Sequence, residues 1–202
     1  MLADFVTSFV ENGDLYWQSI KETSAMVGYS LLISTIIGLF LGVVLVVTRP
    51  NHIYENRVIY GILNVIINIL RSLPFIILMV AIIPFTKIIV GTTIGVKGAI
   101  VPLVVYTAPY IARLLESAML EVDKGVIEAF QAMGATRNQI IFRVLLKESR
   151  PGLILGLTIA TIGLIGASAM AGVVGAGGLG DVAIRYGYQR WEPTVMITCV
   201  IF

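Results

Sequence analysis

The strongest constraint on the fold of this chain is the spacing of its charged residues. Between Glu22 and Arg49 lie 26 uncharged residues, and between Arg150 and Asp181 lie 30. An α-helix rises about 1.5 Å per residue and needs roughly 20 apolar residues to cross the hydrocarbon layer of a membrane. Hydrophobic residues make up 57% of the 202 residues, charged residues make up 13%, and the mean hydropathy is +0.94. The sequence therefore predicts an all-α membrane protein.

The gaps between charges predict about five transmembrane helices in one domain that covers residues 1–202. The expected spans are residues 23–48, 58–85, 94–113 and 151–173, followed by a partial span at 193–202. A helix of roughly ten residues reaches only about 15 Å, half of the hydrocarbon thickness. We therefore expect the natural chain to continue past Phe202 and to complete a fifth helix.

The distribution of Lys and Arg predicts the orientation, because cytoplasmic loops of membrane proteins carry an excess of these residues. Eight of the 14 Lys and Arg follow the first and third expected spans, and five lie on the opposite side. The loop 114–150 is therefore expected to be cytoplasmic, and the N-terminus is expected to lie outside. In this orientation a cytoplasmic partner could reach the loop.

Residues 128–134 form a short amphipathic pattern within that loop. The apolar residues Ala129, Phe130 and Met133 share one helical face with Val126, which lies just before the segment. Glu128 and Gln131 point the other way. A short helix that ends at Gly134 has a suitable shape for docking into a groove of another protein.

This loop resembles the cytoplasmic EAA loop of ABC-importer permeases. That loop reads Glu-Ala-Ala, three residues, Gly, nine residues, then Ile-x-Leu-Pro. The chain matches it at Glu128, Ala129 and Gly134, and it departs at Phe130 (third Ala), Val144 (Ile) and Lys147 (Pro). An ordinary amphipathic cytoplasmic loop is the alternative for this segment by itself.

Other segments resemble the methionine-importer subgroup of these permeases, namely residues 71–78, 83–92, 134–136, 174–180 and 186–188. The resemblance implies a homodimeric permease subunit of a D/L-methionine importer in the bacterial cytoplasmic (inner) membrane. It implies three partners besides the lipid bilayer: an ATP-binding ATPase subunit, a substrate-binding lipoprotein and a second copy of the chain. Nucleic acid is not an expected partner.

The resemblance assigns contact with the ATPase to residues in the 121–135 loop. Glu128, next to Ala129, would make a polar contact with the ATPase. Phe130 or Met133 would insert as an apolar side chain, and Gly134 would form the turn that ends the helix. No phosphate-binding loop, catalytic set or metal-ligand cluster occurs in the sequence, so we expect no cofactor in this chain and ATP-Mg on the partner subunit. The chain itself is expected not to be an enzyme.

A polar face on the second span provides the candidates for the translocation pathway: Asn64, Asn68, Arg71 and Ser72. Polar groups inside a membrane are expensive, and they mark either a pathway or hydrogen bonds between helices. Pro74 is expected to bend the helix that carries them. We find no acidic residue inside the expected spans that could pair with Arg71.

Glycine is used in two further patterns. Residues 175–180 fit the dinucleotide fingerprint G-x-G-x-x-G, but they follow a transmembrane run rather than a strand, so we expect a flexible or closely packed outer loop. Small residues also recur every four or seven residues in the first and fourth spans, including Gly38, Gly42, Gly152 and Gly156. Such stripes suit either packing within the chain or a dimer interface.

A permease for another small amino acid is an alternative within the same family. Two other functional classes also remain open. A passive channel or ion-coupled transporter would need selectivity rings or carboxylates within the membrane, and a membrane-embedded enzyme or assembly anchor would not require an ATPase.

Overall fold

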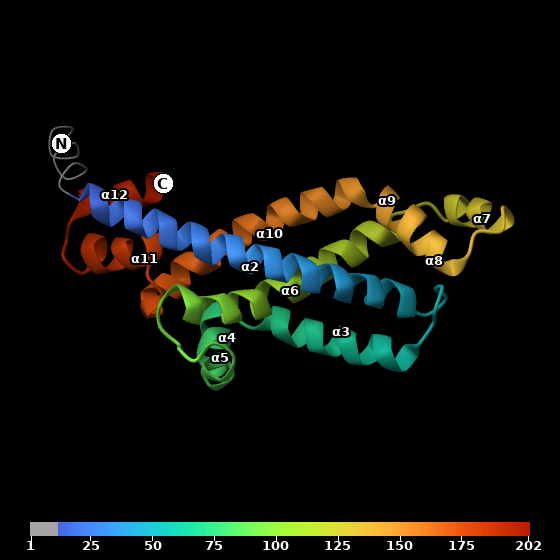
Figure 1. Cartoon of the computed structure of the whole chain (residues 1–202), viewed down its shortest axis with the longest axis horizontal. Coiled ribbons are helices and arrows are strands. Elements are labelled where there is room, and N and C mark those ends of the chain that lie inside the picture. The colour runs from blue at the N-terminus through green and yellow to red at the C-terminus, as the bar shows by residue number, and fades with distance from the viewer. Residues whose placement is uncertain (1–11) are drawn as a thin grey trace. The chain divides into compact units, whose positions relative to one another are not determined.

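The computed structural model describes residues 12–202, and within this range the regular structure is helical (Figure 1). The N-terminus, which is predicted to lie on the outer side of the membrane, falls within residues 1–11, and these are not among the described residues. Three helical segments are long and apolar enough to cross a membrane: Gly13–Thr48 (α2), Gly95–Leu120 (α6) and Arg150–Ala176 (α10, Arg150–Ala171, with the π-helical turn η2, Gly172–Ala176). A fourth candidate span is a bent pair of helices, α3 and α4.

The expected continuous span 58–85 is broken into three helices: α3 (Arg57–Ser72), α4 (Phe75–Ala81) and α5 (Ile83–Val90). Asn56 caps the start of α3, since its side chain accepts bonds from two N–H groups of the first turn at 3.1 Å each. Leu73 ends α3 with an extended backbone, because Pro74 excludes the residue before it from the helical region. The sequence predicted a bend at Pro74, and the structure has a complete break.

The expected loop 114–150 is mostly helical. Helix α6 runs to Leu120 rather than ending at residue 113. Four further elements follow it: α7 (Lys124–Ala132), α8 (Arg137–Gln139), the π-helical η1 (Ile140–Leu145) and α9 (Leu146–Glu148). The reason is burial, because η1 supplies three of the six buried residues of a hydrophobic core that the charge pattern of the sequence did not reveal.

The described chain divides into two compact units. The α7 unit consists of residues 33–73 and 105–161, and the α11 unit consists of residues 12–32, 74–104 and 162–202. The core of the α7 unit joins α2, α6 and η1, and its buried residues are Val46, Leu115, Met119, Ile140, Ile141 and Leu145.

Glycines allow close approach of helix backbones within the α7 unit. A Cβ added at Gly42 would lie 2.8 Å from the carbonyl oxygen of Ala112, and one added at Gly152 would lie 2.8 Å from the Cβ of Ala118. Gly38 is equally crowded against α6. These glycines therefore serve packing within the chain, which the sequence could not distinguish from a dimer interface.

The glycine-rich segment of the α11 unit is closely packed, which was one of the two expectations, and it turns directly into a helix. Gly177 and Gly178 have φ of +83° and +80°, and α11 (Gly178–Val182) begins there and continues into the π-helical η3 (Ala183–Tyr188). The Gly178 N–H donates to Oε2 of Glu22 at 2.8 Å, and the Leu179 N–H donates to Oγ1 of Thr23 at 2.9 Å. The N–H groups that would hold a phosphate in a nucleotide site thus bind side chains of α2.

The last described helix, α12 (Pro193–Ile201), packs in the same unit. Its Val195 is buried in a small cluster with Tyr16 of α2 and Val182 of α11. Gly187 of η3 allows α12 to approach closely, since a Cβ at that position would lie 2.9 Å from the Cβ of Met196.

Candidate functional site

Helix α7 is defined at both ends by its sequence. At its start, the Asp123 side chain accepts a hydrogen bond from the Gly125 N–H at 2.6 Å. At its end, Gly134 has a φ of +83°, the Ala135 N–H donates to the Phe130 carbonyl at 3.0 Å, and the Gly134 N–H donates to the Gln131 carbonyl at 2.9 Å. This pair of bonds around a left-handed glycine is a Schellman motif. The predicted turn at Gly134 is confirmed.

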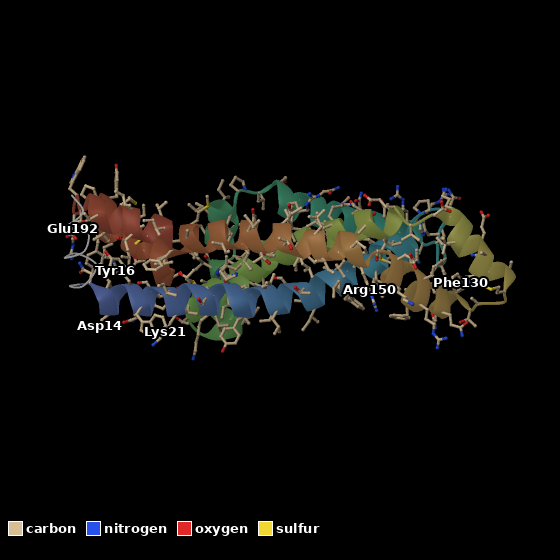
Figure 2. All side chains as sticks on the ribbon, turned by 90° about the horizontal axis from the view of Figure 1, so that it is seen from above. Asp14, Tyr16, Lys21, Phe130, Arg150 and Glu192 are labelled. Atoms are coloured by element: carbon tan, nitrogen blue, oxygen red, sulfur yellow. The ribbon has the colours of Figure 1, made fainter. Side chains whose placement is uncertain are left out.

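The faces of α7 are divided between the core and the solvent. Ile127 packs against the core of the α7 unit together with Val122. Phe130 is 38% exposed and Met133 is 71% exposed, and Figure 2 labels Phe130 on this helix. The apolar pattern of the sequence did not single out Ile127, which holds the helix in place. Large apolar side chains left exposed beside such an anchor are typical of a docking surface.

Glu128 lines a cavity of about 390 Å³ between α7 and the loop that joins α2 to α3. Gln131 and His52 also line it. Burial lowers the pKa of His52, and the positive charges of Arg49 and Lys124 lower it further, so the imidazole favours its neutral form. His52 is half-buried, and it lines the same cavity as Glu128.

The segment after α7 has its own cap. The Thr136 side chain accepts a bond from the Gln139 N–H at 3.4 Å, and the Thr136 N–H donates to the Gln139 side chain at 2.8 Å. This capping box starts α8. The Tyr54 hydroxyl contacts Oδ1 of Asn138 at 3.2 Å, which joins α8 to the α2–α3 loop.

The two asparagines of α3 converge on a residue that the sequence analysis did not select. Nη2 of Arg113 donates to Oδ1 of Asn64 at 2.6 Å and to Oδ1 of Asn68 at 2.9 Å. Nη1 of the same guanidinium donates to Oε2 of Glu116 at 2.5 Å. The asparagines therefore join α3 to α6 by hydrogen bonds.

Glu116 corrects the expectation that the spans contain no carboxylate. It lies inside candidate span α6, and its side chain is only 3% exposed. Besides Arg113, Nη1 of Arg49 lies 3.8 Å from Oε1 and the Tyr60 hydroxyl lies 3.5 Å from it. The sequence signal was available, because Arg and Glu three residues apart face each other on a helix. The expected span ended at residue 113, three residues before this carboxylate, whereas α6 continues to Leu120.

The other two pathway candidates are separate from this network. The guanidinium of Arg71 stacks over the ring of Tyr110 at 5.7 Å, and the Ser72 hydroxyl donates to the Ile69 carbonyl at 2.8 Å. Arg71 thus has an aromatic partner rather than the acidic one that the sequence analysis looked for.

A larger cavity of about 620 Å³ lies in the α11 unit, and none of the predicted pathway residues lines it. Its walls are mainly apolar, with hydroxyl groups from Thr23, Ser24 and Ser168. Among residues 12–202, no group of three or more His, Cys, Asp or Glu side chains is placed to hold a metal ion.

Residues 34–202 match the family model described as the binding-protein-dependent transport system inner membrane component. The chain is 48% identical over 193 residues to the probable D-methionine transport system permease protein MetI of Vibrio cholerae, covering 96% of this chain and 86% of that protein. It is 52% identical over 155 residues to the D-methionine transport system permease protein MetI of Escherichia coli K12, covering 77% and 71%.

The fold is similar to a chain in a structure of the MetNI methionine ABC transporter in inward-facing conformations. The TM-score is 0.91 at 50% identity, covering 95% of this chain and 88% of that chain. A crystal structure of an amino acid ABC transporter gives a TM-score of 0.76 at 20% identity, covering 96% of this chain and 89% of that chain, which is a likeness of fold.

The end of α7 gives a prediction about local stability. A Cβ at Gly134 would meet nothing within 4 Å, so substitution there acts through the backbone alone. Gly134→Val places a β-branched residue in the left-handed region, at roughly 1–2 kcal/mol or more. We expect the amides of residues 128–135 to exchange hydrogen on the order of tenfold faster, measured by mass spectrometry, with normal membrane insertion.

Gly134→Asn is the matched control, because Asn tolerates this conformation. We expect its exchange to stay close to that of the parent chain. Equal protection of α7 in the Val variant would mean that Gly134 does not determine the end of the helix.

Proposed function

The chain belongs to the family of binding-protein-dependent transport system inner membrane components, and we propose that within this family it is the permease subunit of an ATP-driven D/L-methionine importer. The observation that carries the proposal is helix α7, which holds Phe130 and Met133 exposed while Ile127 anchors it to the core. The relatives with about half of their residues in common are named for D-methionine transport. ATP hydrolysis belongs to a separate ATPase subunit.

The proposed contact with the ATPase uses α7 as a rigid element. Phe130 or Met133 enters an apolar groove of the ATPase, while Glu128 offers a carboxylate at the mouth of its cavity to a basic side chain of that partner. Ala129 lies between Glu128 and Phe130 in sequence, and its small side chain would allow the ATPase to approach the helix closely. Movement of the ATPase would then be transmitted through Ile127 and Val122 into the helices of the α7 unit.

We further propose that two copies of the chain form the pathway and that a binding lipoprotein delivers the substrate. Asn64 and Asn68, with Arg71 and Ser72 further along the chain, remain our candidates for residues that line the pathway. Arg113 joins this set, because its guanidinium already donates to both asparagines and is partly exposed. A zwitterionic amino acid with an apolar side chain suits the amide groups of Asn64 and Asn68, which carry no charge that would trap it.

An ion-coupled transporter is the second candidate, and Glu116 is the observation that favours it. A buried carboxylate within a membrane span is the usual carrier of a coupling proton. Here both carboxylate oxygens already have cationic neighbours, Arg113 and Arg49, so Glu116 belongs to a network that joins helices. The importer remains the better account because it also explains α7.

Uptake of labelled methionine tests the proposed function. In vesicles that contain this chain, its ATPase and its binding protein, we expect uptake that requires ATP, persists when a protonophore is added, and is inhibited by D-methionine but not by arginine or maltose. Gly134→Val should transport poorly while inserting normally. Uptake driven by a proton gradient without ATP would favour the ion-coupled transporter, and competition by arginine instead of methionine would discard the substrate.

The orientation proposed from the Lys and Arg distribution places the N-terminus outside and residues 113–150 in the cytoplasm. Single cysteines at Asn12 and Asn138, in a background with Cys199→Ser, can be labelled with an impermeant reagent. Intact cells should label Asn12→Cys alone, and opened vesicles should label both. Labelling of Asn138→Cys in intact cells would reverse the orientation.

A further inference from the structure

A groove of about 570 Å³ lies within the α7 unit, between α2 and the segment from η1 to α10. Leu39 and Val43 of α2, with Leu146 and Leu153 opposite, line it and also pack against the core. Phe40 and Phe142 line it as well, yet they are 69% and 66% exposed. The groove is therefore an open apolar surface, and part of its lining is held in place by packing against the core.

Two cations interrupt this apolar lining. Lys147 and Arg150 both line the groove, and Figure 2 labels Arg150 at the start of α10. Within residues 12–202, neither makes an ion pair. The adjacent carboxylate of Glu148 lines a different cavity, together with Glu121 and Asp123. The groove thus presents positive charge that the described part of the chain leaves uncompensated.

Lys147 also occupies the position at which the EAA pattern has proline, a departure that contact with an ATPase does not explain. The π-helical turn η1 ends two residues before Lys147, and such turns occur frequently at functional sites. Phe142, Leu146, Arg150 and Leu153 recur at spacings of four and three residues, so one helical face carries both the apolar groups and the charge.

We propose that this groove binds one anionic phospholipid, with its acyl chains against Phe40 and Phe142 and its phosphate beside Lys147 and Arg150. Both walls belong to candidate membrane spans or to the residues directly before one, so lipid is the solvent there. Basic pockets between such helices bind anionic head groups, and each Lys or Arg favours an anionic over a neutral lipid by roughly fivefold. Charge complementarity selects this occupant over a second apolar protein surface.

Quenching of tryptophan by brominated lipid tests the proposal on the full chain in vesicles. The chain has two tryptophans, Trp17 and Trp191, which are replaced by Phe so that Phe142→Trp is the single reporter. The vesicles contain phosphatidylcholine with a varied fraction of phosphatidylglycerol, and either lipid carries the bromine. We expect brominated phosphatidylglycerol to bind at the reporter at least fivefold more tightly than brominated phosphatidylcholine.

Charge variants then locate the head group. Lys147→Gln with Arg150→Gln should remove the preference while phosphatidylcholine still quenches, which shows that the groove remains folded and open to lipid. Arg143→Gln is the matched control, because Arg143 is an exposed cation of the same segment that does not line the groove, and it should keep the preference. Lys147→Arg should also keep it.

Equal quenching by the two lipids in the parent chain would overturn the proposal, because the groove would then be ordinary lipid contact. Quenching by neither lipid would also overturn it, since a protein surface such as a second copy of the chain would cover the groove. Neither result would affect the proposed transport of methionine.

Discussion

The buried carboxylate of Glu116 is the interaction on which the arrangement of the α7 unit depends. A charged group with a side chain only 3% exposed must be compensated, and removal of one partner from such a pair typically costs about 3–5 kcal/mol. Its partners come from three places: Arg113 from α6 itself, Arg49 from the end of α2, and Tyr60 from α3. The carboxylate therefore fixes where three helices meet.

The same network determines how α7 is held. Arg113 satisfies Glu116 with one nitrogen and the two asparagines of α3 with the other. Helix α6 can then continue past the charges to Leu120, and the core residues Leu115 and Met119 pack beside α2 and η1. Ile127 joins this core, so α7 rests on a firm support. A force applied to α7 would reach the helices that carry the proposed pathway residues, Asn64 and Asn68.

Much of the fold follows from local sequence chemistry. The gaps between charges predicted about five transmembrane helices, and three of these are long apolar helices in the structure. Gly134 predicted the end of α7 because its left-handed conformation is a local requirement. The family could be inferred from the residues around Glu128 and Gly134. Contacts between distant segments could not be predicted in this way. Ile127 looked like any apolar loop residue, and the bonds from Arg113 to Asn64 depend on how α3 and α6 pack.

Two other differences from the expected structure have different causes, one local and one from a distant segment. Pro74 breaks the expected second span completely, because it also forces Leu73 into an extended backbone. The glycine-rich segment is closely packed and leads directly into α11, since the N–H groups of Gly178 and Leu179 find acceptors on Glu22 and Thr23. Those acceptors lie 156 residues away in sequence, beyond the reach of any local pattern.

Cross-linking to the ATPase tests the central claim, that α7 is the element through which the partner drives this permease. Met133→Cys, in a chain with Cys199→Ser, is treated with a short bifunctional thiol reagent in the assembled complex, and Ile197→Cys, exposed in the α11 unit, is the control. The account predicts that Met133→Cys cross-links to the ATPase, that ATP changes the yield, and that Ile197→Cys does not cross-link. A complex that copurifies intact yet gives no cross-link from Met133→Cys, with or without ATP, would contradict it.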